Sequence, residues 1–338
     1  MGELKGIVKS MKKMDVTAMG ELLIDFTENG VSGQGNPLFE ANPGGAPCNV
    51  LAMLSKLGHD TAFIGKVGND SFGAQLKDAI REVGICADYL RMDGEVHTTL
   101  ALVHTFPDGD RDFSFYRNPG ADMMLSEKEV PEDLIVNSKI FHYGTLSMTH
   151  EGVRAATKKA LNIAKTNRIL ISFDPNLRPP LWNSLEEAKE QVLYGLQYCD
   201  VLKISDNEIQ WLTGEEDYTK GVSWIKERYP EIQLIFVTMG KEGSRAYYGD
   251  MMVEAAACIN EKTFETTGAG DTFCGCVLHA ILENGLENLS EEKLRETLQF
   301  ANSAASLITT RKGALRVMPE REEIIDNMKT EGKYEKRN

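Results

Sequence analysis

The chain has 338 residues, 42% of them hydrophobic, and a formal net charge of −14. This length and composition are sufficient for a large α/β core, and the negative charge argues against nucleic acid or an anionic membrane as a partner. The first residues carry charges without an apolar signal-peptide core, and no run of about 18 apolar residues occurs, so we expect a protein of the cytoplasm.

The first predicted strand extends from Asp15 to Phe26, and we assign no role to the extension formed by residues 1–14. After a polar, glycine-rich segment, Gly44 and Gly45 precede a helix predicted from Ala46 to Leu57. Such a pair of glycines is typical of a simple turn. It also lets a ligand hydroxyl reach the backbone, with Asp25 and Asn49 as flanking hydrogen-bonding groups.

The next segments alternate between strand and helix. Thr61–Gly65 has the pattern of a short buried strand, and Ser71–Val83 that of an amphipathic helix. This alternation predicts a mostly parallel sheet covered by helices. Thr98–Phe106 and Asp112–Arg117 then form a predicted β-hairpin around the turn at 107–110.

Aromatic residues are frequent in this hairpin, which favours a segment that covers a ligand or meets a partner subunit over an exposed ornament. We expect residues 26–43 and 95–120 to form a small β lid.

Three apolar segments are predicted to be central strands, namely 169–173, 201–204 and 234–237. Each is followed by polar or small residues. These are Asp174, Asn176 and Arg178, then Ser205 and Glu208, then Thr238 and Gly240. Ligands bind beyond the carboxyl ends of strands in open α/β sheets, so the three groups predict one active-site edge.

Glu265–Phe273 reads ETTGAGDTF and precedes the small and apolar run 274–282, which is typical of a loop that opens a helix. Gly268, Ala269 and Gly270 leave the backbone accessible, and the free N–H groups at a helix start favour a phosphate. Asp271 lies where a carboxylate can accept a proton from a hydroxyl. In isolation the same motif is typical of a tight turn in which the aspartate caps the helix. Ser290–Thr310 is predicted to form another helix.

Two of these segments carry a family resemblance. NPGGAPCNV at 42–50 and ETTGAGDTFCGCVL at 265–278 resemble the two motifs of PfkB-type, ribokinase-like carbohydrate kinases. The segments 115–125, 173–182 and 203–214 are more similar to fructokinases than to ribokinases. The resemblance extends from Asp15 to about Pro319. It implies one kinase domain over residues 15–330, with a doubly wound α/β fold, a mostly parallel sheet flanked by helices, and a small β lid.

The resemblance also implies roles for individual residues. Asp271 matches the catalytic base, and the amides of Gly268, Ala269 and Gly270 match the anion hole for the transferred phosphoryl group. The positions that match sugar contacts are Asp25, Gly44, Gly45, Asn49, Phe115, Arg117 and Arg178. The positions that match nucleotide contacts are Lys203, Thr238, Gly240, Gly243 and Asn302. Glu208 matches a group that orders Mg²⁺ through water.

Two positions depart from the family pattern. Ser205 stands where the broader family has Asn, as it does in fructokinase-like members. Glu265 stands where the family usually has Asp beside a K⁺ site, and its longer side chain is expected to shift or weaken K⁺ binding.

The reaction implied is transfer of phosphate from ATP, with Mg²⁺, to the 6-hydroxyl of D-fructose. The same chemistry on 2-keto-3-deoxygluconate, ribose or a nucleoside is the nearest alternative, and a non-catalytic regulator with a kinase fold is a more distant one. The family also leads us to expect a homodimer formed through the lid.

The chain has six cysteines and six histidines. Neither set shows zinc-ligand spacing, so we expect both to be structural or surface groups.

Overall fold

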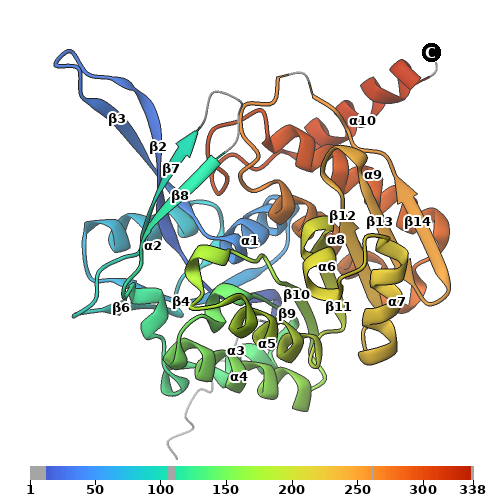
Figure 1. Ribbon diagram of the computed structural model, residues 1–338, viewed down its shortest axis with the longest axis horizontal. Coiled ribbons are helices and arrows are strands. Elements are labelled where there is room, and N and C mark those ends of the chain that lie inside the picture. The colour runs from blue at the N-terminus through green and yellow to red at the C-terminus, as the bar shows by residue number, and fades with distance from the viewer. Residues whose placement is uncertain (1–12, 106–110, 261, 336–338) are drawn as a thin grey trace, which may run out of the picture.

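The computed structural model describes residues 13–105, 111–260 and 262–335 (Figure 1). A large sheet runs through its centre in the order β14-β13-β12-β11-β10-β9-β1-β4-β5, and β6 also pairs with β4. Its strands are β1 (Met14–Met19), β4 (Thr61–Gly68), β5 (Ile85–Cys86), β6 (Leu90–Asp93), β9 (Ser138–Gly144), β10 (Leu170–Asp174), β11 (Val201–Ser205), β12 (Leu234–Thr238), β13 (Ser244–Tyr248) and β14 (Met251–Ala255).

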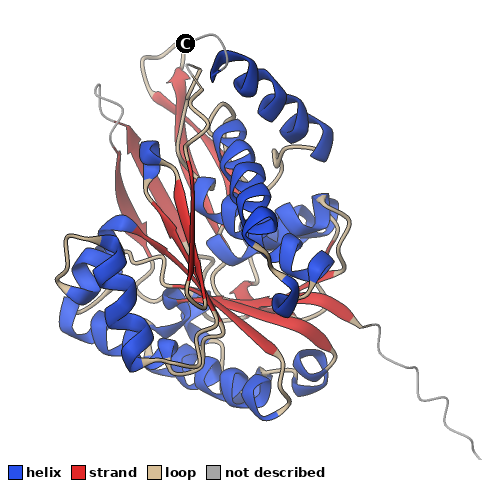
Figure 2. Ribbon diagram, turned by 90° about the vertical axis from the view of Figure 1, so that its right-hand side faces the viewer, coloured by secondary structure: helices blue, strands red, loops and turns tan. Residues whose placement is uncertain are grey.

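Along this sheet, the neighbouring strands β4, β1, β9, β10, β11 and β12 pair in parallel. The strands β13 and β14 form an antiparallel edge. Both faces of this sheet are covered by helices, as Figure 2 shows. In β12, Leu234 and Phe236 face one apolar core, whereas Ile235 and Val237 face the other. A strand buried on both faces is a continuous apolar run, which is how the sequence predicted this one.

One face packs against α1 (Ala46–Lys56), α2 (Ser71–Glu82), α8 (Ala269–Asn284), α9 (Glu291–Ile308) and α10 (Arg321–Glu335). The other packs against α3 (Glu132–Val136), α4 (Glu151–Thr166), α5 (Leu185–Leu196), α6 (Asp206–Thr213) and α7 (Tyr218–Arg228). Short 3₁₀ turns lie at 121–124, 127–129, 145–148, 179–181, 240–242 and 286–288. The expected doubly wound, mostly parallel α/β fold is therefore confirmed. Within the described residues, no helix is both long enough and apolar enough to cross a lipid bilayer.

Helix starts follow the capping pattern of the sequence. Asp70 accepts a hydrogen bond from the amide of Gly73 at the start of α2, and Ser290 accepts one from Lys293 at the start of α9. Both helices lie within about two residues of their predicted bounds, since side-chain caps of this kind satisfy N–H groups that lack helical partners.

A second, smaller sheet stands beside the first, in the order β3-β2-β7-β8. It consists of β2 (Leu23–Val31), β3 (Pro37–Gly44), β7 (Leu100–Thr105) and β8 (Arg111–Tyr116), and its β2–β3 arm projects from the body of the molecule (Figure 1). The predicted hairpin is present as β7 and β8, and its turn at 107–110 lies outside the described residues.

The prediction of a single strand from Asp15 to Phe26 is wrong, because two strands occupy this segment. The chain turns at residues 20–22, so that β1 joins the central sheet and β2 joins the small sheet. The segment 26–43, which the sequence assigns to a small β lid, is mostly strand. Gly20 lets the turn pack closely against the start of α1, because a Cβ at this position would lie 2.5 Å from the Pro47 ring.

Candidate active site

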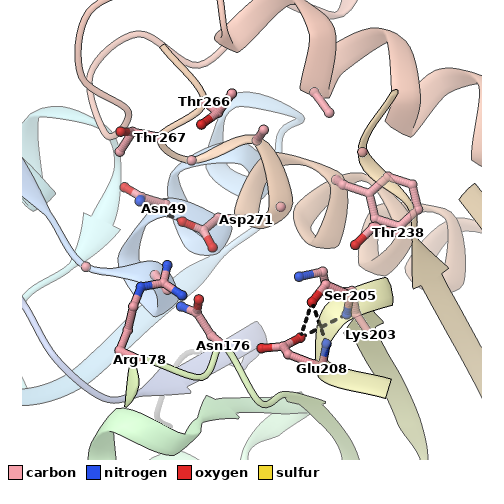
Figure 3. Close-up of a pocket in the computed structure, with 18 of the residues that line it drawn as sticks. Asn49, Asn176, Arg178, Lys203, Ser205, Glu208, Thr238, Thr266, Thr267 and Asp271 are labelled. Atoms are coloured by element: carbon pink, nitrogen blue, oxygen red, sulfur yellow. Dashed lines mark hydrogen bonds between the residues drawn. The ribbon is translucent and has the colours of Figure 1, made fainter. Parts of the chain in front are cut away.

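A cleft of about 450 Å³ opens at the carboxyl ends of β10, β11 and β12 (Figure 3). The small sheet, the start of α1 and the start of α8 complete its walls. The three polar groups predicted to share one edge therefore do meet here. Most of the candidate site residues line this cleft, namely Asp25, Gly45, Asn49, Phe115, Arg178, Lys203, Glu208, Thr238, Gly240, Gly243, Gly268, Ala269, Gly270, Asp271 and Asn302.

The first turn of α8 faces the cleft. Gly268 precedes the helix in the left-handed conformation, with φ of 78°, and its carbonyl accepts the amide of Thr272 at 2.8 Å. A Cβ at Gly268 would lie 2.7 Å from the side chain of Ala314, which adds a second reason for glycine. Asp271 is the third helical residue and does not cap the helix, because the cap position belongs to Gly268. The first amides of a helix lack intrahelical partners, so this turn can receive an anion.

Asp271 is held by a neighbour from α1. Asn49 donates from Nδ2 to Oδ2 of Asp271 at 2.8 Å (Figure 3). Burial raises the pKa of Asp271, while the hydrogen bond from Asn49 and the charges of Lys203 and Arg178 oppose that rise. The other amide atom, Asn49 Oδ1, is buried and has no hydrogen-bond partner among the described residues. Asn49 thus orients the carboxylate of Asp271 and keeps one buried acceptor of its own unused.

Glu21 positions the start of α1, which carries Asn49. Its Oε1 accepts the amide of Ala46 at 2.8 Å, and its side chain is only 3% exposed. Burial raises its pKa to about 7, although the charge of Arg117 and the two backbone hydrogen bonds act to lower it. Glu21 also lines the cleft, although it was not among the candidate residues. No sequence signal marked it, because it was placed within a continuous strand.

A buried ion pair lies beneath α8. Lys203 Nζ is 3.1 Å from Oδ2 of Asp174, and both side chains are less than a tenth exposed. Burial raises the pKa of Asp174 to about 7, with Lys203 opposing the rise. Burial acts to lower the pKa of Lys203, but the charges of Asp174 and Glu208 outweigh it and raise this pKa. Lys203 therefore stays cationic, and its Nζ lies beside Gly270, only 3.1 Å from where a Cβ would stand.

Glu208 joins the loops that follow β10 and β11. Its Oε1 accepts the amide of Leu177 at 2.7 Å, and its Oε2 accepts the amide and hydroxyl of Ser205, each at 2.9 Å. These contacts form a capping box at the start of α6. The box depends on Ser205, the residue that stands where the broader family has Asn. Arg178 follows Leu177 and is exposed, and its guanidinium points toward Asp271 in Figure 3.

The other end of the cleft is formed by backbone turns and uncharged side chains. Gly240 and Gly243 have positive φ values of 53° and 105°, and a Cβ at Gly243 would collide with the carbonyl of Ala255. Asn302 donates to the carbonyls of Ala255 and Ala256 at 3.2 and 2.9 Å, so it fixes the end of β14. Its Oδ1 accepts from the hydroxyl of Ser244 at 2.8 Å.

Three candidate residues do not line the cleft. Gly44 and Glu265 border a separate small cavity, where the amide of Gly313 donates to Glu265 Oε1 at 2.7 Å. Arg117 is 7% exposed, and its guanidinium is committed to a buried ion pair with Asp122 at 2.6 Å. It also donates to Thr149 Oγ1 and to the carbonyl of Leu146, so it anchors β8 to the protein body.

Several residues of the cleft were not among the candidates. Besides Glu21 these are Leu23, Ala46, Leu146, Asn176, Ser205, Asp206, Thr266, Thr267, Phe273 and Ala305. The sequence places Asn176 and Ser205 at this edge, because both follow predicted central strands, but it assigns them no role at the site. The position of Leu146 depends on tertiary packing and has no local signal.

Comparisons with known proteins agree with this geometry. The family described as pfkB family carbohydrate kinase matches residues 13–321. "Fructokinase-2" of Solanum habrochaites is 40% identical over 319 residues, which cover 93% of this chain and 96% of the relative. "Probable fructokinase-6, chloroplastic" of Arabidopsis thaliana is 42% identical over 313 residues, which cover 91% of this chain and 81% of the relative.

Solved structures show the same similarity. A fructokinase from Xylella fastidiosa with bound ATP has a TM-score of 0.85 at 28% identity, with 95% of this chain and 100% of that chain covered. A fructokinase from Vibrio cholerae O395 bound to fructose, ADP and calcium ion has a TM-score of 0.82 at 27% identity, with 93% and 99% covered.

Proposed function

The chain belongs to the pfkB family of carbohydrate kinases, and we propose that it transfers the γ-phosphoryl group of ATP to the 6-hydroxyl of D-fructose. The observation that carries the proposal is the position of Asp271, within the first turn of α8 and in a cleft that Asn49 and Lys203 also line. A base, the amides of a helix start and a cation then surround one point. Fructokinases are prominent among the relatives and among the similar structures, which favours fructose over other sugars.

The transfer is a direct in-line displacement. Asp271 takes the proton of the 6-hydroxyl as that oxygen forms a bond to the γ-phosphorus, and the bond from this phosphorus to the bridging oxygen of ADP breaks. Burial raises the pKa of Asp271, which makes it a stronger proton acceptor than an exposed aspartate. The amides of Gly268, Ala269 and Gly270 receive the charge that shifts on the phosphoryl oxygens.

The sugar lies between Asp25, Asn49 and Arg178 in this proposal. Asn49 Oδ1 is a buried acceptor that lacks a partner among the described residues, and a sugar hydroxyl would supply the missing donor. Phe115 belongs to β8 and lines the same cleft, so the small sheet can exclude water from the reacting groups. Arg117 contributes indirectly, by holding β8 in place.

The nucleotide occupies the part of the cleft lined by Lys203, Thr238, Gly240, Gly243 and Asn302. Mg²⁺ bound with ATP would neutralise phosphate charge, and the carboxylate of Glu208 is placed to order its waters. Because Glu208 already accepts three hydrogen bonds from the chain, we assign it an outer role. A double mutant of the Vibrio cholerae O395 fructokinase has been solved with fructose, ADP and potassium ion. For this chain we propose weak K⁺ activation, since Glu265 Oε1 is used by Gly313.

The small sheet also supports a proposal about assembly. Val31, Leu38 and Phe39 on the β2–β3 arm are 63%, 47% and 42% exposed, and Tyr116 on β8 is 61% exposed. Apolar side chains gathered on one projecting sheet favour a partner surface, and we propose a homodimer formed through the lid. We propose that this dimer acts in the cytoplasm.

A coupled assay for ADP release at fixed ATP and Mg²⁺, over a panel of acceptors, tests the function. D-fructose should give the highest kcat/KM, above ribose, 2-keto-3-deoxygluconate and adenosine, and ³¹P NMR should place the product phosphate on the 6-oxygen. A higher kcat/KM for another acceptor would replace fructose in the proposal. Absence of ADP release with every acceptor would instead favour a non-catalytic regulator.

A further inference from the structure

Two histidines from distant parts of the chain meet beside the C-terminal half of α8, beyond the first turns of the helix that line the cleft. His59 lies in the turn between α1 and β4, and His279 lies in the C-terminal half of α8. Nε2 of His59 is 2.7 Å from Nδ1 of His279. At this distance one ring nitrogen must accept a proton from the other, so at least one ring is neutral. Burial lowers the pKa of His279 to about 4, helped by His59 and Arg321, so its ring is neutral at pH 7.

A carboxylate completes a set of three. Glu283 lies four residues after His279 on α8, so both side chains project from one face of the helix. One ring nitrogen of each histidine and a carboxylate oxygen of Glu283 all lie within 4.8 Å of one another. His59 is half-buried and His279 is buried, whereas Glu283 is exposed, so an ion can enter from the solvent side.

An independent observation concerns the far side of the His59 ring. Its Nδ1 is 3.6 Å from Oδ2 of Asp15. Asp15 is itself held by Lys139 at 2.8 Å and by the amide of Asp60 at 2.9 Å. Histidines that bind metals usually pass their second N–H to a carboxylate, which fixes the ring and its tautomer. At 3.6 Å the contact is an ion-pair approach and not a hydrogen bond, but it places a carboxylate on the side of the His59 ring opposite His279.

We propose that His59 Nε2, His279 Nδ1 and the carboxylate of Glu283 form a binding site for a zinc-like transition metal ion, with a fourth position open to water. Two imidazoles and one carboxylate are ligands that Zn²⁺ accepts in tetrahedral sites. Tetrahedral bonds of about 2.0–2.1 Å would place the two nitrogens roughly 3.3 Å apart, so the rings must separate slightly. The ion would join the turn after α1 to α8, apart from the Mg²⁺ that accompanies ATP.

Arg321 at the start of α10 opposes this site. Its Nη1 lies 3.3 Å from Nε2 of His279, and a guanidinium can only donate. In the metal-free protein, Nε2 of His279 therefore accepts and Nδ1 carries the proton. Metal binding at Nδ1 requires the other tautomer and displaces the positively charged guanidinium. Arg321 is exposed, which leaves it room to move.

The test is titration of the full-length protein with Zn²⁺, and with Co²⁺ for its absorption spectrum, in the absence of nucleotide, sugar and Mg²⁺. We expect one ion per chain, and affinity at least tenfold lower in His59→Gln and in Glu283→Gln. His97→Gln is the matched control, because its side chain is 93% exposed and lies between β6 and β7, and it should bind like the parent. Circular dichroism verifies folding, and Glu283→Gln changes an exposed side chain, so the test survives if His59→Gln does not fold.

Two further measurements test whether these three residues bind the metal ion. Zn²⁺ should raise the melting temperature of the parent but not that of Glu283→Gln, whose kinase activity should match the parent. Arg321→Ala should bind Zn²⁺ more tightly, because it removes a competing donor and a positive charge. Equal affinities of the parent and Glu283→Gln would overturn the site. Weaker binding by Arg321→Ala would overturn the use of His279 Nδ1 as a ligand.

Discussion

The side-chain amide of Asn49 donates to the carboxylate of Asp271 at 2.8 Å, across 222 residues of sequence. The contact joins the first turns of α1 and α8, which pack along each other in the same core. One carboxylate oxygen is thereby oriented by the protein, which leaves Oδ1 as the atom for the acceptor hydroxyl. The two glycine-rich motifs of the chain therefore act together, because Asn49 of the first motif orients Asp271 of the second.

Replacement of Asn49 with Ala should lower kcat about tenfold or more, because Asp271 loses the group that orients it. Asn49 also acts to lower the pKa of Asp271, so its removal should raise that pKa further. The base form would then be lost at higher pH, and the acid limb of the kcat profile should shift upward. The profile is measured from pH 5 to 9 with saturating fructose and ATP. An unshifted limb would show that another group controls it.

Asp271→Asn should abolish most turnover while fructose still binds, since a general base contributes about 10²–10⁴-fold. Folding stability at pH 7 should not fall. The pKa of Asp271 is raised in the folded state, so folding disfavours its charged form at neutral pH, and a neutral amide avoids that cost. Steady-state assays, calorimetric titration with fructose and thermal melting measure the three quantities. Near-full activity would exclude Asp271 as the base.

Local sequence patterns were sufficient for some parts of the structure and insufficient for others. The ends of β10, β11 and β12 could be predicted, because buried runs stop at Asp174, Ser205 and Thr238. The strand from Pro37 to Gly44 could not, since an exposed strand of the small sheet has little apolar alternation. The turn near Gly20 was hidden within apolar residues on either side.

Contacts across the chain were also beyond local patterns. The family resemblance assigned Arg117 to the sugar site. Its ion pair with Asp122 could not be predicted, because it depends on how β8 packs against the protein body. Likewise, no spacing in the sequence could bring His59 to His279, which are 220 residues apart. The expectation that both histidines are structural groups rested on spacing alone, and spacing detects only ligands that are close in sequence.

Arg117 and Arg178 should separate stability from sugar binding. Arg117→Met leaves Asp122 charged and buried, so we expect unfolding to become easier by about 3–5 kcal/mol. Arg178→Met removes an exposed side chain near Asp271 and should leave stability unchanged while it raises the KM for fructose. Urea unfolding and steady-state kinetics compare the two variants. A stable Arg117→Met protein with a raised KM would return Arg117 to a role at the sugar.

Lys203 and Asp174 should be coupled in stability but not in catalysis. Lys203→Met strands the buried carboxylate of Asp174 and should destabilise the fold, whereas the double variant with Asp174→Asn should recover most of the loss. Neither protein retains the cation beside Gly270, so both should show a raised KM for ATP and a lower kcat. A double-mutant cycle by denaturant unfolding, with kinetics on each protein, measures this. Recovery of kcat in the double variant would show that Lys203 acts on the fold alone.

Glu21 should make the stability of the fold depend on pH. Its pKa is raised from an ordinary 4.5 to about 7 by burial, so the folded protein binds this proton more tightly than the unfolded chain does. The stabilisation is complete below about pH 4.5 and is lost as the pH rises toward 7, by roughly 3 kcal/mol.

Glu21→Gln keeps an oxygen that can accept the amide of Ala46 but cannot ionise, so its unfolding free energy should fall less between pH 5 and pH 8. Urea unfolding of parent and variant at both pH values isolates this residue, because the other titrating groups are common to the two proteins. Parallel pH dependences would mean that Glu21 is not protonated in the folded state at pH 5. The start of α1 would then accommodate a charged carboxylate beside the site of the reaction.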